Sequence, residues 1–113
     1  MSGLDQTIKE DDLAEFPEGV SKVLDLIARK WIMQILYVLR NNDLTFTELK
    51  NQLGSVSNQE LAKKLKELTL KELVERQDSF MTEKDTHIYV STVTGKDLCD
   101  LLEKIQAFGD KYL

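Results

Sequence analysis

The side chains with the clearest chemistry lie in SVSNQELAKKLKEL, residues 55 to 68, where amide and basic side chains recur at helical spacing. One face of this helix would turn inward through Leu61, Leu65 and Leu68. The opposite face, called the polar face below, would carry Asn58, Gln59, Ala62, Lys63 and Lys66. Asn and Gln can bond adenine edges at two points, and Lys suits phosphate or guanine. The segment is therefore either a DNA-reading helix or an ordinary solvated one.

Residues around this helix could contact phosphate. Ser57 with Glu60 forms the sequence pattern of a capping box, and a helix N-terminus favours an anion. Thr47 is predicted to cap the preceding helix, TELKNQL, and could bond phosphate in the same way. Lys64 lies off the polar face, so it is either solvated or a backbone contact. Arg76 could reach phosphate or pair with a neighbouring carboxylate.

The distribution of charge decides whether a nucleic-acid partner is compatible with a net charge of -5. Residues 1 to 18 hold six acids and one base, whereas the rest of the chain holds 14 of each. We therefore predict an acidic, mobile arm over residues 1 to 18 and one domain over residues 19 to 113. Residues 57 to 76 hold five bases and four acids, so affinity for DNA should be modest and strongly salt-dependent.

Hydrophobic spacing predicts helices in the first half of this domain. They cover residues 19 to 28 and residues 30 to 41, and the second helix is apolar on nearly all sides, as expected at the centre of a core. A short extended piece follows at residues 43 to 46. A helix that ends at Gly54 and the capped helix over residues 57 to 70 then form a helix-turn-helix.

After Leu68 the spacing of apolar residues changes from the helical period to the alternation of a strand. LVERQDSF and HIYVST alternate as strands around the polar turn MTEKDT, which predicts a two-stranded β-hairpin. Thr94, with Asp97 three residues later, can cap a final helix, and Thr92 is an alternative cap. The predicted fold class is α+β, mostly α: a winged helix-turn-helix with a hairpin wing and a C-terminal dimerisation helix.

Several residues match a known family of winged helix-turn-helix proteins in type, spacing and order, which makes the prediction more specific than the order of elements alone. They are Lys30, Trp31, Phe46, Glu48, Leu49, Ser57, Leu61, Leu65, Glu67, Leu68, Leu73, Val74, Glu75, Arg76, Tyr89, Thr92 and Gly95. Over roughly residues 20 to 113 the chain thereby resembles the HxlR-type family of bacterial and archaeal transcriptional regulators, relatives of the MarR type. The resemblance implies a homodimer that binds double-stranded DNA, with two recognition helices in successive major grooves and the wings beside the backbone.

Two sets of residues carry these functions in the prediction. The DNA-contacting set is Thr47, Ser57, Asn58, Gln59, Lys63, Lys64, Lys66, Arg76 and Lys84. The last helix has a longer apolar stripe than a small core can cover, so a twin helix is a reasonable partner. The predicted dimer contacts are Val20, Leu24, Leu98, Leu101, Leu102, Ile105 and Phe108.

Three positions depart from the family pattern. Glu18 stands nearest to a cysteine that some members use to sense oxidants or electrophiles, so a thiol switch there is excluded. Cys99 instead lies on the last helix, beside the apolar stripe. A cysteine in such a place is more often a buried small hydrophobe than a sensor of oxidants or electrophiles. Glu72 replaces a glycine after the recognition helix, so we expect that helix to end differently. Lys84 has an acid on each side, which weakens the wing's hold on DNA.

Other function classes have less support. His87 and Cys99 are the chain's single histidine and cysteine, so we expect no metal, no cofactor and no enzyme activity. The chain shows no signal peptide or membrane-spanning run, which predicts a cytoplasmic protein. The alternative is a winged-helix module that holds a protein partner without binding DNA, as the acidic arm and wing favour. The lysines of the polar face favour DNA, and the sequence does not identify a small-molecule effector.

Overall fold

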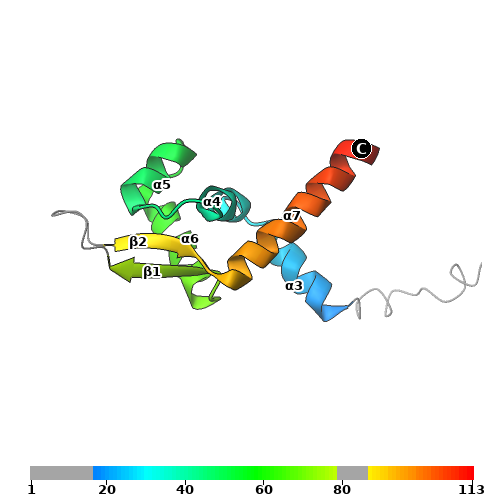
Figure 1. The fold of residues 1–113 in the computed structure, drawn as a ribbon, viewed down its shortest axis with the longest axis horizontal. Coiled ribbons are helices and arrows are strands. Elements are labelled where there is room, and N and C mark those ends of the chain that lie inside the picture. The colour runs from blue at the N-terminus through cyan, green and yellow to red at the C-terminus, as the bar shows by residue number, and fades with distance from the viewer. Residues whose placement is uncertain (1–16, 79–86) are drawn as a thin grey trace, which may run out of the picture. The chain divides into compact units, whose positions relative to one another are not determined.

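The computed structural model describes residues 17–78 and 87–113 (Figure 1). The elements follow in the order α3 (Glu18–Ile27), α4 (Ile32–Leu39), α5 (Phe46–Leu53), α6 (Asn58–Leu70), β1 (Val74–Asp78), β2 (His87–Ser91) and α7 (Val93–Tyr112). This order confirms the predicted winged helix-turn-helix with its hairpin and C-terminal helix. The predicted arm up to residue 16, and the turn that holds Lys84, lie outside the described residues.

The chain divides into two compact units, Met1–Lys30 and Trp31–Leu113. In the first unit, α3 starts directly after Pro17, which suits a helix start because proline has no N–H to leave unbonded. None of the residues of α3 is buried. Val20 and Leu24 are exposed, whereas Val23, Leu26 and Ile27 are half-buried. The helix begins and ends one residue earlier than the sequence predicts.

The core of the second unit is built around α4. Ile32, Ile35, Leu36 and Leu39 are buried, and α4 packs against α5, α7 and β2 (Figure 1). This confirms the predicted centre of the core. The predicted helix began earlier, but Trp31 has a φ of 75° and lies before the helix, whose first residue is Ile32. Among the helices in the described ranges, none is long and apolar enough to cross a bilayer.

The prediction that Thr47 caps α5 is wrong. Thr45 is the cap: its Oγ1 accepts from the Glu48 N–H at 3.2 Å, and the Glu48 carboxylate accepts from the Thr45 N–H at 2.9 Å. Only the earlier threonine has a glutamate three residues later, so only it can form a reciprocal capping box. Thr47 lies inside the first turn, while Gly54 ends the helix with a φ of 78°, as predicted.

The end of α6 contradicts the expectation for Glu72. This residue has a φ of 61°, the left-handed conformation that a glycine would adopt there. The Leu73 N–H donates to the Leu68 carbonyl and the Glu72 N–H donates to the Thr69 carbonyl, both at 3.0 Å. These two bonds form a Schellman motif, with the buried leucines at either end as its apolar contact. Tertiary packing therefore imposes the usual ending on an unfavourable residue.

The hairpin pairs β1 and β2 antiparallel, in a register that runs from Val74 opposite Ser91 to Asp78 opposite His87. Leu44 adds a single bridge to Tyr89, with N–H to carbonyl distances of 3.1 Å and 2.7 Å. This bridge is the predicted short extended piece before α5. It ties the chain segment between α4 and α5 to the strand β2.

The helix α7 begins at Thr92, the alternative cap, and the prediction for Thr94 is wrong. The Thr92 Oγ1 accepts from the Gly95 N–H at 3.0 Å and donates to the Glu72 carbonyl at 2.7 Å. The Thr92 N–H also donates to the Leu73 carbonyl at 3.2 Å. Thr94 has no comparable position, because the bonds to the end of α6 favour the threonine that directly follows β2.

Replacing Glu72 with glycine should stabilise the protein. A left-handed conformation costs about 1–2 kcal/mol for an L-residue, and glycine's greater freedom in the unfolded chain offsets part of that. We expect Glu72→Gly to raise the free energy of unfolding by about 1 kcal/mol in urea titrations. Glu72→Ala removes the carboxylate but keeps the Cβ, so it should change little. A loss of stability in the glycine variant would contradict this account.

Candidate nucleic-acid interface

The two faces of α6 separate as the sequence predicts. Leu61, Leu65 and Leu68 are buried, with 0%, 1% and 0% of their surface exposed. The polar face, made by Asn58, Gln59, Ala62, Lys63 and Lys66, is exposed at every position. Burial of the leucines therefore fixes the rotation of the helix and turns the amides and lysines outward.

The start of α6 can hold an anion. Ser57 is extended, and its Oγ accepts from the Glu60 N–H at 3.0 Å, so the predicted cap is confirmed. The remaining N–H groups of the first turn point away from the helix and carry its positive dipole end. Asn58 and Gln59 lie in this turn, directly beside any phosphate or base edge that approaches the helix start.

A hollow of ≈ 440 Å³ lies between the second half of α6 and the hairpin strands. Lys66 and Arg76 supply its positive charge, and Phe46 and Tyr89 supply aromatic surface. Lys64 is half-buried and does not line this hollow. The structure thus brings Lys66 and Arg76 together, as part of one surface, and leaves Lys64 off it.

Arg76 is engaged on the wing in a way that sequence reasoning missed. Its Nη2 lies 3.1 Å from Nε2 of His87, and Nδ1 of His87 lies 2.9 Å from Oδ1 of Asp78. In a neutral ring protonated at Nδ1, Arg76 donates to the imidazole and the imidazole donates to the carboxylate. The alternation of both strands could have revealed this cluster, because Asp78 and His87 are directly opposite.

The turn of the helix-turn-helix is held by a residue that the sequence did not single out. Lys50, near the end of α5, donates from Nζ to the Val56 carbonyl at 3.1 Å. Val56 itself is buried, with 1% of its surface exposed. The turn is therefore anchored by an ammonium and an apolar side chain. Thr47 is exposed in the first turn of α5, where it remains a predicted phosphate contact.

The candidate dimer residues divide by exposure. Val20 and Leu24 on α3, and Leu101, Ile105 and Phe108 on α7, are exposed large apolar side chains. Leu98 is half-buried, and Leu102 is only 3% exposed. Leu102 already contributes to the core of the chain itself, so its predicted place in a dimer interface needs correction. Phe108 continues the exposed stripe, with its ring centroid 5.0 Å from that of Tyr112.

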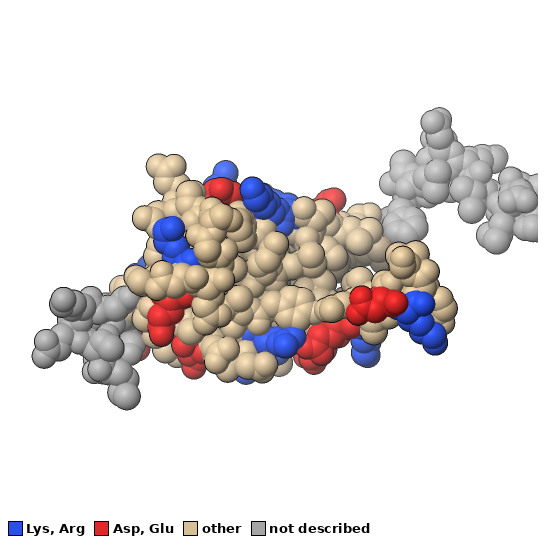
Figure 2. Space-filling view, turned by 90° about the horizontal axis from the view of Figure 1, so that it is seen from above, with Lys and Arg blue, Asp and Glu red and all other residues tan. Residues whose placement is uncertain are grey.

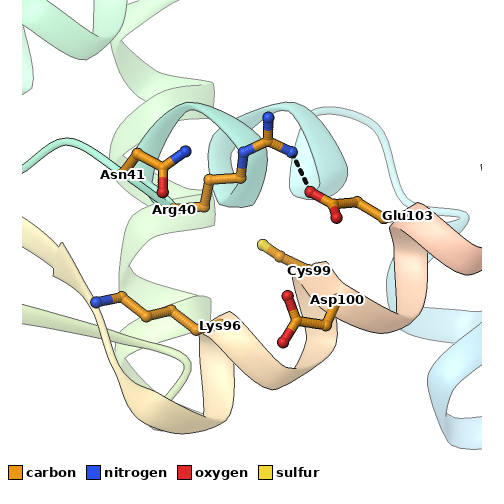
Figure 3. Close-up of a pocket in the computed structure, with 6 residues that line it drawn as sticks. All are labelled: Arg40, Asn41, Lys96, Cys99, Asp100 and Glu103. Atoms are coloured by element: carbon orange, nitrogen blue, oxygen red, sulfur yellow. Dashed lines mark hydrogen bonds and ion pairs between the residues drawn. The ribbon is translucent and has the colours of Figure 1, made fainter.

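Cys99 borders a small hollow of ≈ 290 Å³ between α4 and α7 (Figure 3). Its thiol is buried and donates to the Leu36 carbonyl at 3.4 Å. Burial raises the pKa of the thiol, and the nearby Arg40 opposes this only in part. Arg40 is itself bound to Glu103, with Nη1 to Oε1 at 2.6 Å. The burial agrees with the predicted role of a small hydrophobe.

Known proteins share this sequence pattern and this arrangement. The model of the HxlR-like helix-turn-helix family matches residues 26–113. The HTH-type transcriptional regulator YodB of Bacillus subtilis (strain 168) is 30% identical over 93 residues, which cover 82% of each chain. YvaP of the same organism, an HTH-type transcriptional regulator, is 29% identical over 93 residues, covering 81% of this chain and 84% of YvaP.

A solved structure of the reduced form of YodB has a TM-score of 0.77 against this chain at 28% identity. The matched region covers 84% of this chain and 92% of the YodB chain. The likeness therefore extends over the helix-turn-helix, the hairpin strands and the C-terminal helix together, and not over one motif alone.

The environment of Cys99 predicts low thiol reactivity. A raised pKa leaves less thiolate at any pH below it, and the thiolate is the nucleophile. At pH 8 we expect iodoacetamide to alkylate the folded protein at least about 10-fold more slowly than the chain in guanidinium, with N-acetylcysteine as the reference thiol. Equal rates in the folded and unfolded states would show that the thiol is accessible and ionised, contrary to the structure.

Proposed function

The chain belongs to the HxlR-like helix-turn-helix family of transcriptional regulators, and we propose that it acts as a homodimer that binds specific sites on double-stranded DNA. The observation that carries this proposal is the polar face of α6. Its amides and lysines are all exposed, opposite leucines that are wholly buried. An α-helix of this kind fits the major groove of B-DNA.

Within this proposal the residues divide by the part of DNA that they meet. Asn58 and Gln59, at the start of α6, bond base edges, and the small Ala62 permits close approach. Lys63 and Lys66, one turn later, bind phosphate or guanine. The remaining contacts position the protein on the DNA backbone and carry no sequence information. They are Thr47, Ser57, Lys64, Arg76 and Lys84.

The dimer is proposed from the exposed stripe of α7, with the apolar residues of α3 as a second contact. Ile105 and Phe108 are 47% and 59% exposed, although apolar side chains of this size are usually buried. Two copies related by a twofold axis would cover both stripes at once. Such a dimer places two recognition helices about one helical turn of DNA apart.

A second candidate function is a protein-interaction module that does not bind DNA. The observation that favours it is the mixture of charges: on the face seen in Figure 2, basic and acidic side chains are interspersed and no single basic patch forms. The near-neutral balance around α6 points the same way. We favour DNA because the polar face itself carries lysines and amides but no acid. For either function we propose a cytoplasmic location, without a cofactor or enzyme activity.

The test of the proposed function is a mobility-shift titration with the DNA upstream of the protein's own gene, at two salt concentrations. We expect a specific complex at low salt that weakens steeply as salt rises, because binding releases counterions from phosphate. If a protein shown to be folded and dimeric gives no complex at low salt, DNA binding is refuted and the interaction module becomes the better account.

Substitutions on the polar face should separate specificity from affinity. Gln59→Ala should alter preference among DNA sequences by about 1–3 kcal/mol at one base pair, because a two-point bond to a base edge is lost. Lys63→Ala and Lys66→Ala should weaken all sequences similarly and lower the salt dependence by about one counterion each. Lys22→Ala removes an equal charge from α3 and serves as the control. Unchanged binding in all three variants would mean that α6 is not the recognition helix.

A glutamate in the α7 stripe should break the dimer. We expect Phe108→Glu and Ile105→Glu to halve the mass measured by light scattering and to abolish specific DNA binding, because burying an unpaired carboxylate is costly. Ala107→Glu places the same side chain on the opposite side of α7 and should leave the dimer intact. Leu102 is unsuitable for this test, because it is buried within the chain. An unchanged mass in both stripe variants would refute this interface.

A further inference from the structure

Three side chains on one face of the hairpin are joined by hydrogen bonds. Residues two apart on a strand point to the same face, so Arg76 and Asp78 on β1 share a face with His87, which lies directly opposite Asp78 on β2. The Nη2 of Arg76 lies 3.1 Å from Nε2 of His87, and Nδ1 of His87 lies 2.9 Å from Oδ1 of Asp78. These three residues are called the wing cluster below.

We propose that His87 is a positioning residue for Arg76: its neutral imidazole holds the guanidinium on the hairpin, and its protonation releases the guanidinium to DNA phosphate. Binding of DNA is then accompanied by the uptake of a proton at Nε2 of His87. The effect on DNA rests on the proposed function, whereas the hydrogen-bonded state of the wing cluster does not.

The geometry fixes the protonation state of the imidazole. A guanidinium nitrogen can only donate, so Nε2 of His87 accepts from Arg76 and carries no hydrogen. An ionised carboxylate can only accept, so Nδ1 carries the hydrogen that is donated to Asp78. The ring is therefore neutral in this arrangement.

Protonation at Nε2 changes the wing cluster in two ways. The nitrogen becomes a donor and can no longer accept from Arg76, and two positive groups then face each other across the same 3.1 Å. The bond from Nδ1 to Asp78 is kept, and the carboxylate stabilises the imidazolium. The lost bond and the repulsion both favour movement of the guanidinium away from His87, and a phosphate offers it a charge-assisted bond.

The charges on the neighbouring elements leave this balance to the wing cluster. The hairpin packs against α6 through β1 and against α4, α5 and α7 through β2. On α6, Lys66 lines a hollow with Arg76, and none of the described residues that line this hollow is acidic. On α5, the Glu48 carboxylate accepts from the Thr45 N–H at 2.9 Å. The charged residues at the end of α4 and on the first half of α7 border a separate hollow; they are Arg40, Lys96, Asp100 and Glu103.

One proton is a large change for this part of the surface. Residues 57 to 76 hold five bases and four acids, and Asp78 adds a fifth acid, so residues 57 to 78 carry no net charge. Protonation of His87 adds one positive charge beside them. Histidine changes its charge between pH 5 and 8, and affinity for DNA follows the number of phosphates that a protein neutralises. We therefore expect affinity for DNA to rise as the pH falls through this range.

The first test needs no DNA. The chain has one histidine, so the imidazole gives a single set of signals in a ¹⁵N-correlated spectrum. At pH 8 we expect Nδ1 to carry the hydrogen and Nε2 to carry none. On acidification the guanidinium signals of Arg76, assigned by their loss in Arg76→Ala, should shift together with the imidazole signals. A hydrogen on Nε2 at pH 8, or guanidinium signals that do not follow the imidazole, would overturn the proposal.

The second test measures affinity for DNA by fluorescence anisotropy at pH 8 and pH 6, with the duplex used in the mobility shifts. We expect binding at pH 6 to be at least about threefold tighter, with a salt dependence greater by about one counterion. Arg76→Ala should cost more affinity at pH 6 than at pH 8, because at pH 8 the guanidinium is held by His87. Equal affinity of the unaltered protein at both pH values would contradict a proton-linked role.

The variant His87→Gln separates this role from a purely structural one. Glutamine does not titrate, but its amide can accept from Arg76 and donate to Asp78, so the hairpin keeps both bonds. We expect this variant to match the unaltered protein at pH 8 and to gain no affinity at pH 6. Gln77→Ala, on the opposite face of β1, is the matched control and should keep the full response. A folded His87→Gln variant that still responds to pH would refute the assignment.

Failure of this inference can be distinguished from failure of the proposed function. A DNA complex whose affinity is the same at both pH values refutes the role of His87 and leaves the regulator proposal intact. If no DNA complex forms at either pH, the regulator proposal and the proton-linked binding fail together. The imidazole spectrum then still decides whether His87 holds Arg76 on the hairpin.

Discussion

The rest of the structure depends on the close approach of the α7 backbone to the Leu73 carbonyl at Gly95. A Cβ at position 95 would collide with that carbonyl oxygen and would lie 2.8 Å from Oγ of Ser91. The same junction receives the two hydrogen bonds of Thr92, to the carbonyls of Glu72 and Leu73. The end of α6, the start of the wing and the start of the proposed dimer helix are therefore fixed to one another at a single point.

The junction holds the end of α6, and burial of its leucines fixes the rotation of the helix. Its three buried leucines each contribute about 2 kcal/mol by leaving water, far more than an exposed lysine gains or loses by its direction. Packing thus decides which face is outward, and the polar face results from it. Because positive charge nearby is scarce, we attribute selectivity to base-edge contacts by Asn58 and Gln59, with the lysines setting a modest, salt-sensitive affinity.

The sequence predicted the parts of the fold that depend on periodicity. The element order and the inward leucines of α6 follow from spacing alone. The caps were harder, because closely spaced threonines compete, and the actual caps at Thr45 and Thr92 depend on partners supplied by the fold. The left-handed Glu72 and Trp31 were beyond prediction, since packing overrides the intrinsic preference of each residue. For the site, single residues on the polar face were predictable, whereas the link between Arg76 and His87 required the strand register.

Dimethyl sulfate footprinting of the protein on its target DNA shows whether two α6 helices enter successive major grooves. Guanine N7 lies in the major groove and adenine N3 in the minor groove. We expect two blocks of protected guanine N7 positions about 10 base pairs apart, while adenine N3 stays reactive both within these blocks and between them. Protection of adenine N3 alone, or a single block of protection from a dimeric protein, would contradict it.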